Sequence, residues 1–221
     1  MIIAIDGPAA SGKSTTAKIV AEILRFTYLD TGAMYRCVTL AMINAGIHVS
    51  NTEQINDLLE NISIDLLDKN GKLQIMMNNL DVSDDIRSGK VTENVSAVSA
   101  LKNVREAMVK MQRNIASKTN CVMEGRDIGT VVFPNAEYKF YLSADSVVRA
   151  ERRQRDLLAL GDEKSIQELI EDINRRDEYD SSREISPLKK AEDAIEINTT
   201  DLTIDGQVSK IIEIVNKQKT K

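Results

Sequence analysis

Short apolar runs alternate with longer stretches of helical periodicity along most of the chain. The first apolar run, at 2–6, is followed at 15–25 by a pattern in which Ile19, Val20, Ile23 and Leu24 share one side. Strands separated by helical segments are typical of parallel sheets, whose crossovers are right-handed. We therefore predict an α/β three-layer fold, a five-stranded parallel sheet with helices on both faces. Its strands are expected near 2–6, 27–29, 121–124, 137–142 and 193–197.

A helix predicted over 33–45 begins with an unusual feature. Asp30 or Thr31 can cap it, because short polar side chains accept hydrogen bonds from the first free N–H groups. Arg36 then falls in the first turn, where the helix dipole disfavours a cation. Arg36 is either an accident of the sequence or a side chain that reaches an anion held nearby. Further helices are predicted at 52–61, 90–100, 102–118, around 149–155, at 165–178 and at 204–217.

The periodicity changes to two between these helices. Residues 62–66 and 72–76 alternate apolar and polar positions, Asn70-Gly71 between them is a hairpin turn signal, and 80–82 could add a third strand. We expect a small antiparallel β insertion. It is either decoration or a mobile flap over a second substrate.

A glycine-rich loop joins the first strand to the first helix. It reads Gly7, Pro8, Ala9, Ala10, Ser11, Gly12, Lys13, Ser14 and Thr15, the Gly-x4-Gly-Lys-Ser spacing of a phosphate-binding loop (P-loop) in its strand–turn–helix context. Glycines let successive N–H groups converge on an anion, and the following helix presents its positive end. Lys13 can reach the outer phosphates and the Ser14 hydroxyl can bind Mg²⁺. The loop predicts binding of a nucleoside triphosphate.

Composition narrows the function further. The 221 residues are 42% hydrophobic and 29% charged, as in soluble globular proteins, and the net charge of −5 argues against general nucleic-acid binding. Cys37 and Cys121 have neither disulfide nor metal-ligand spacing, and no apolar run is long enough to span a membrane, so we expect a cytoplasmic protein. His48 stands alone and is expected to be an ordinary loop residue.

Arginines are concentrated in one part of the chain. Residues 126–183 contain 8 Arg and 2 Lys, whereas the rest contains 5 Arg and 14 Lys. Arginine is preferred where a planar fork must bind phosphate, so this bias favours a phosphate site over a merely solvated surface. Glu124, Arg126 and Asp127 also follow a predicted strand, at the edge where open α/β sheets bind ligands.

Three runs of the sequence resemble the bacterial cytidylate kinases. They are Asp-Thr-Gly-Ala-Met-Tyr-Arg at 30–36, Gly-Arg-Asp-Ile-Gly-Thr at 125–130 and Arg-Arg-Asp-x-x-Asp-x-x-Arg at 175–183. They occur in order and with matching gaps, so the resemblance covers nearly the whole chain. It implies a nucleoside monophosphate kinase that transfers the γ-phosphoryl group of ATP, with Mg²⁺, to CMP or dCMP in pyrimidine nucleotide metabolism.

The resemblance also implies an organisation for the single domain. Its core would comprise 1–36, 90–148 and 184–221, with the first strand at the centre of the sheet. A monophosphate-binding insertion would occupy about 37–89, and a helical lid about 149–183. Glu124 departs from the family, which often has Asp there, so its role near Mg²⁺ or Arg126 is open.

Roles carry over to the matching residues. The phosphate loop, Arg149 and Arg152 would hold ATP, while Lys13, Arg126, Arg153 and Arg183 would be catalytic. The CMP phosphate would be bound by Arg36, Arg126 and Arg183, the cytosine by Thr31, Ser96, Arg105 and Asp127, and the sugar by Arg176 and Asp180.

The chemistry agrees with this assignment. Phosphoryl transfer needs positioning and charge neutralisation, and the CMP phosphate is already an anion, so no catalytic base is needed. Closing a lid and an insertion needs free surfaces, which favours a monomer with small-molecule partners only. The rivals are another P-loop kinase for a metabolite such as AMP or shikimate, a GTPase switch and a non-catalytic nucleotide-binding module. The guanine-reading Asn/Thr-Lys-x-Asp run of a GTPase is absent, and a binding module would leave the second set of arginines unexplained.

Overall fold

The computed structural model describes residues 1–69, 72–159 and 161–219. They form two compact units, one made of Met1–Leu29 and Ala116–Lys221 and the other of Asp30–Ile115. The turn predicted at Asn70-Gly71 lies outside the described residues. The expected division into core, insertion and lid stays a prediction.

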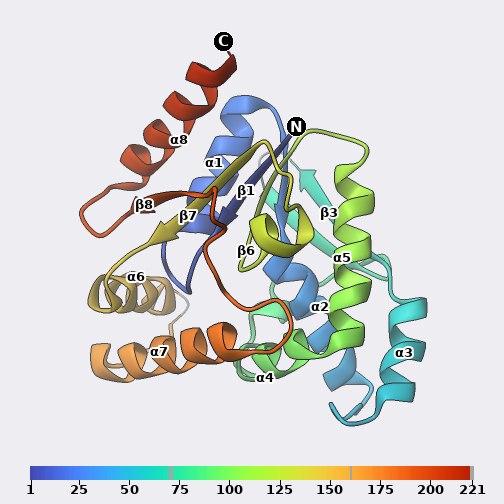
Figure 1. The fold of residues 1–221 in the computed structure, drawn as a ribbon. Helices are drawn as coiled ribbons and strands as arrows, with labels where there is room; N and C mark the ends of the chain where they lie inside the picture. Colours follow the sequence, from blue (N-terminus) through green and yellow to red (C-terminus); the bar gives the residue numbers. More distant parts are fainter. Residues whose placement is uncertain (70–71, 160, 220–221) are drawn as a thin grey trace. The chain divides into compact units, whose positions relative to one another are not determined.

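A five-stranded sheet forms the centre of the first unit, with β1 in its middle (Figure 1). β1 pairs in parallel with β6 and β7, and β7 pairs in parallel with β8. The predicted fold, including the central first strand, is therefore confirmed, and the strand boundaries agree within two residues. The strand order is β2 (Thr27–Asp30), β6 (Cys121–Gly125), β1 (Ile2–Asp6), β7 (Tyr138–Ser143) and β8 (Ile195–Asn198).

Two helices, α1 (Lys13–Leu24) and α8 (Ile204–Lys219), pack against each other and against one face of this sheet (Figure 1). Alternate strand residues such as Ile3, Ile5 and Phe140 are buried there, because successive side chains of a strand point to opposite faces. One detail of the predicted apolar side of α1 is wrong. Ile23 is 55% exposed, since the buried stripe of the helix runs through Ala17, Val20 and Ala21.

The helices α6 (Ser146–Leu158) and α7 (Ile166–Ser182) pack side by side through a small apolar cluster that includes Leu157, Leu169 and Ile173 (Figure 1). A capping box at Ser165 starts α7. We expected this helix to end near residue 178, with Asp180 in a loop, and that is wrong. The helix continues to Ser182, so Asp180 is a buried helical residue, and its carboxylate accepts from Arg126 Nε at 3.0 Å.

The second unit is mainly helical. The helix α2 (Thr31–Asn44) packs against α4 (Gly89–Ala100), the short 3₁₀ turn η1 (Asp85–Arg87) and α3 (Thr52–Asn61). Asp30 caps α2 by accepting from Ala33 N at 2.9 Å. Because α2 starts two residues earlier than predicted, Arg36 lies in its second turn, where the dipole penalty is smaller. The helix α5 (Lys102–Ala116) buries Val104 and Met108.

A three-stranded antiparallel sheet completes the second unit. It comprises β3 (Ile64–Lys69), β4 (Lys72–Met77) and β5 (Leu80–Asp81), in that order. Ile64 lies opposite Met77 and Leu66 opposite Ile75. The apolar residues of the two alternating segments are therefore cross-strand neighbours. The predicted antiparallel insertion, with its third strand, is confirmed.

Candidate active site

The phosphate loop is held from outside through its carbonyl groups. Ala9 O accepts from Arg149 Nη1 at 3.1 Å, and Ser11 O accepts from Thr199 Oγ1 at 3.0 Å and Arg152 Nη1 at 3.4 Å. A peptide's N–H and C=O point in roughly opposite directions, so fixing the carbonyls also fixes where the N–H groups point. The contacts thus support the shape of an anion-binding nest.

The glycines of the loop are required by close approaches. A Cβ on Gly7 would lie 2.2 Å from the Leu142 carbonyl oxygen, and one on Gly12 would lie 2.8 Å from Gln207 Oε1. Gly12 also has φ of 90°, in the left-handed region where glycine is favoured. Gln207 in addition accepts from Thr16 Oγ1 at 2.7 Å, which ties α8 to the first turn of α1.

Lys13 is buried at the start of α1, where its ammonium donates to Pro8 O at 2.9 Å. Burial, followed by the positive charge of Arg126, lowers its pKa to about 7, while the Glu124 carboxylate acts in the opposite direction. The charged form of Lys13 therefore lacks a full counter-charge. A bound phosphate would supply it.

Asp6, the last residue of β1, receives two backbone hydrogen bonds from the turn that follows β6. Ile128 N and Gly129 N donate to its two carboxylate oxygens at 2.9 and 2.7 Å. These residues begin η2 (Ile128–Val132), a single π-helical turn, and such turns are frequent at functional sites. Burial raises the pKa of Asp6 to about 7, although the two N–H donors counteract it.

Four of the predicted substrate residues come together at the ends of β6 and α7. Arg126 Nε donates to Asp180 Oδ2 at 3.0 Å, and Arg183 lies 3.8 Å from Asp180 and 4.0 Å from Asp127. Both carboxylates and the Arg183 side chain are almost fully buried. Buried guanidinium groups grouped in this way are suited to binding a phosphate, which could take the place of the carboxylates.

Two arginines of α6, Arg149 and Arg152, contact the phosphate loop. Besides the contacts above, Arg149 donates from Nε to Ala144 O at 3.1 Å, and Arg152 donates from Nη2 to Thr199 O at 2.6 Å. Arg153 is half-buried on the same helix, and Arg176 on α7 is near enough to Lys13 to help lower its pKa. Ser14, the predicted metal ligand, is exposed in the first turn of α1.

The remaining predicted residues belong to the second unit. Arg36 donates from Nη1 to Ile86 O and to Thr92 Oγ1, both at 3.0 Å, so two neutral acceptors hold its guanidinium in this structure. Arg105 is 2% exposed, donates to Ser99 O at 3.1 Å and lies with its guanidinium 5.2 Å from the centre of the Tyr35 ring.

The second unit contains two further residues that were predicted to bind cytosine. Thr31 is buried at the first position of α2, and Ser96 is half-buried on α4, one turn before Ser99. The structure therefore places the predicted base-binding residues of this unit at the start of α2, on α4 and on α5.

Sequence reasoning missed three residues that support the loop. Asp177 accepts from Ala9 N at 3.1 Å, Thr199 contacts Ser11 O, and Gln207 contacts Thr16. Asp177 stood inside a recognised run, between two residues that were assigned roles, whereas Thr199 and Gln207 carried no local signal. Glu124, whose role the sequence left open, accepts a hydrogen bond from Tyr28 Oη at 2.9 Å.

Two features are absent from the described residues. No group of three or more His, Cys, Asp or Glu side chains in 1–69, 72–159 and 161–219 could hold a metal ion. Among the helices of those same ranges, none combines the length and the apolar character that crossing a membrane requires.

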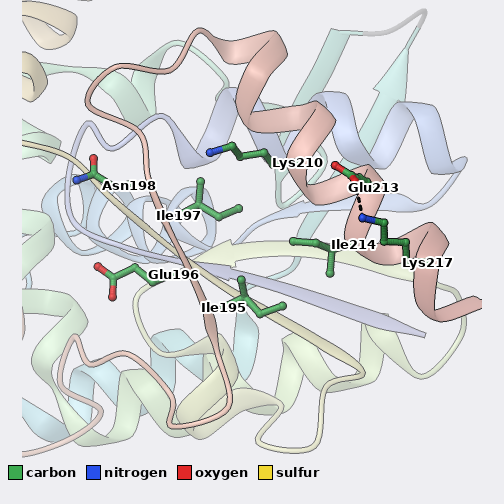
Figure 2. A pocket seen from close by; sticks show the side chains of 8 residues that line it. All are labelled: Ile195, Glu196, Ile197, Asn198, Lys210, Glu213, Ile214 and Lys217. Carbon is green, nitrogen blue, oxygen red and sulfur yellow. Dashed lines mark hydrogen bonds and ion pairs between the residues drawn. The ribbon is translucent and has the colours of Figure 1, made fainter.

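A groove of about 330 Å³ lies away from these residues, along β8 and α8 (Figure 2). Its side chains mix both charge signs with apolar groups, and Lys217 pairs with Glu213 one turn earlier on α8. A phosphate loop binds anions through backbone N–H groups and does not need a deep cavity, so this groove is not the stronger candidate. The groove is lined by Ile195, Glu196, Ile197, Asn198, Lys210, Glu213, Ile214 and Lys217.

Known proteins are similar to this chain over nearly its whole length. A family model described as cytidylate kinase matches residues 3–217. A protein named cytidylate kinase from Halalkalibacterium halodurans is 49% identical over 99% of this chain and 98% of its own length. One of the same name from Lactobacillus johnsonii is 48% identical over 99% of this chain and 95% of its own length.

Solved structures with low sequence identity share the fold. A shikimate kinase from Bacteroides thetaiotaomicron has a TM-score of 0.51 at 15% identity, covering 98% of both chains. An uncharacterised protein from Eubacterium ventriosum has a TM-score of 0.54 at 14% identity, again covering 98% of both chains. At such identities the likeness shows the P-loop kinase fold alone.

Proposed function

The chain belongs to the cytidylate kinase family, and from this premise we propose that it transfers the γ-phosphoryl group of ATP to CMP or dCMP. The products are ADP and CDP or dCDP, which places the enzyme in pyrimidine nucleotide metabolism. One observation supports this proposal independently of the family assignment. Arg126, from the arginine–carboxylate cluster, is close enough to Lys13 of the phosphate loop to lower its pKa. Groups suited to two different phosphates therefore share one neighbourhood.

The donor nucleotide is bound by the residues from Gly7 to Thr15. Lys13 neutralises the outer phosphates, and Arg149, Arg152 and Arg153 act from α6. The support for Arg149 and Arg152 is their contact with carbonyl groups of the loop, which is indirect. Arg153 rests on the motif match and its position on the same helix.

The acceptor nucleotide is bound through its phosphate by Arg36, Arg126 and Arg183. In the first unit, Asp180 lies within 3.0 Å of Arg126 and 3.8 Å of Arg183, so an incoming phosphate would compete with this carboxylate. Cytosine is assigned to Thr31, Ser96, Arg105 and Asp127, and the sugar to Arg176 and Asp180. These assignments rest on matching motifs in the sequence.

The metal is proposed to be Mg²⁺, with the Ser14 hydroxyl as its protein ligand. An exposed hydroxyl fits this role, because Mg²⁺ retains several waters and takes its other ligands from phosphate oxygens. When bound, the metal would neutralise charge on the phosphates. We further propose a cytoplasmic monomer that binds small nucleotides and neither nucleic acid nor membranes.

The proposal is tested by measuring ADP release with ATP, Mg²⁺ and each nucleoside monophosphate in turn. CMP should be strongly preferred over UMP. Uracil presents an oxygen where cytosine presents an amine, so Asp127 would lose its donor. Each unpaired buried polar group costs about 1–3 kcal/mol, or roughly ten- to hundredfold in kcat/KM. Equal kcat/KM for the two nucleotides would contradict the assignment of Asp127.

Replacing Arg126 by Ala should lower kcat/KM for CMP by about a hundredfold while ATP binding survives, because one donor to a developing charge is lost. Arg175→Ala is the matched control. Arg175 is an exposed arginine that pairs with Asp172 on the outer side of α7, so its removal should leave turnover nearly unchanged. If Arg126→Ala and Arg175→Ala behaved alike, the acceptor site would have to be sought elsewhere.

A further inference from the structure

Asp177 on α7 forms a closed ring of contacts with one residue of the phosphate loop. Its Oδ1 accepts from Ala9 N at 3.1 Å, and its Oδ2 pairs with Arg149 Nη1. The same Arg149 nitrogen donates to Ala9 O at 3.1 Å. Both backbone polar groups of Ala9 are thus held by one ion pair.

The ring is largely shielded from water. The Asp177 side chain is 18% exposed and the Arg149 side chain 8%. Hydrogen bonds to charged groups are stronger than those between neutral groups, and removing one partner of a shielded pair leaves the other uncompensated. Arg149 is also fixed by Ala144 O at its Nε. The ring is therefore a firm attachment between α6, α7 and the loop.

The residue after Ala9 shows what the attachment holds in place. Ala10 has φ of 57°, a left-handed conformation that costs free energy for any residue with a Cβ atom. Ala10 also packs against the apolar cluster between α6 and α7. Ala9 and Ala10 are thus positioned by the helix pair, through hydrogen bonds at the first residue and apolar contact at the second.

We infer that Asp177 is a positioning residue for the ATP site, which acts through the Ala9 peptide and Arg149 to keep the phosphate loop in its nucleotide-binding shape. This inference rests on the proposed function, since it names a further residue of the same site. It predicts an effect on the donor nucleotide in particular. The loop's N–H groups are the ligands of the ATP phosphates, whereas CMP is assigned to other residues.

The test is steady-state kinetics of Asp177→Asn and Asp177→Ala, together with titration of a fluorescent ATP analogue in the absence of CMP. Asparagine keeps an acceptor for Ala9 N but removes the charge that holds Arg149. We expect KM for ATP to rise about tenfold in the Asn variant and about a hundredfold in the Ala variant. KM for CMP should change less than about twofold, because each substitution removes contacts with the phosphate loop and none with the residues assigned to CMP.

Asp172→Asn is the matched control, because this carboxylate lies on the same helix but pairs outward with Lys164 and Arg175. It should leave both KM values near those of the wild type. Arg149→Lys should reproduce the selective loss of ATP affinity. Combined with Asp177→Asn, it should add little, since both changes break the same ring.

Three results would overturn the inference. One is an unchanged KM for ATP in Asp177→Ala, and another is full additivity of the two changes. The third is a parallel rise of both KM values with a fall in melting temperature, which is what a general structural role predicts. If the wild type did not phosphorylate CMP, the proposed function would fail instead, and the titration with the ATP analogue would still decide the role of Asp177.

Discussion

Nucleotide binding should draw a proton onto Lys13. In the absence of ligand its pKa is lowered from 10.5 to about 7, chiefly by burial and then by repulsion from Arg126. A triphosphate beside the ammonium supplies the missing negative charge and raises the pKa again. Binding therefore converts a partly neutral lysine into a fully charged one, and the proton comes from the solvent.

The size of the effect follows from the pKa. With a value of about 7, Lys13 is roughly half neutral at pH 7 and about nine-tenths neutral at pH 8, so binding should take up about 0.5 and 0.9 proton respectively. Between pH 7 and pH 8 this group alone should weaken ATP binding by about fivefold, and above pH 8 by nearly tenfold for each further pH unit.

The assay is titration calorimetry with a non-hydrolysable ATP analogue at pH 8, in two buffers of different ionisation enthalpy. At that pH the terminal phosphate, whose second pKa is about 6, is already ionised and contributes little. Lys13→Arg is the control, because arginine stays protonated and cannot take up the proton. Asp6, whose pKa is raised to about 7, could also bind a proton, so Asp6→Asn separates its share.

Two outcomes would refute this reasoning. One is proton uptake by the wild type that is close to zero at pH 8. The other is uptake that persists unchanged in Lys13→Arg, because the titrating group would then lie elsewhere.

Two further predictions concern folding. Lys13→Met should be more stable than the wild type at pH 7, by a margin that shrinks toward pH 10 in thermal melts. The unfolded chain binds more protons at Lys13 between pH 7 and 10.5, so wild-type stability rises with pH across that window. Gly7→Ala should lower the free energy of unfolding by about 1–3 kcal/mol in urea, since its Cβ would lie 2.2 Å from the Leu142 carbonyl oxygen. Gly89→Ala, which meets nothing within 4 Å, should be nearly neutral, and equal effects at the two glycines would contradict the close approach.

The local sequence pattern was enough to predict the helices, the strands and the phosphate loop. Strand and helix periodicities depend on residues two to four apart, so the parallel sheet and the antiparallel insertion could be predicted from the sequence. The spacing from Gly7 to Ser14 likewise encodes a turn whose hydrogen-bonding geometry is local. The ends of helices were harder to predict, as the position of Asp180 in α7 shows. Whether a polar segment continues a helix depends on what its side chains meet after folding, and Asp180 meets Arg126.

The kinds of groups in this protein are evident from the sequence: a loop for phosphates, an excess of arginine between residues 126 and 183, and the strands that carry them. Which of these groups meet depends on how the chain folds. The bond between Asp177 and Ala9 joins residues 168 positions apart, and that between Asp6 and Gly129 joins residues 123 apart. The pKa of Lys13 was equally beyond local pattern, because burial and the charges of Arg126 and Glu124 set it, and these depend on the path of the whole chain.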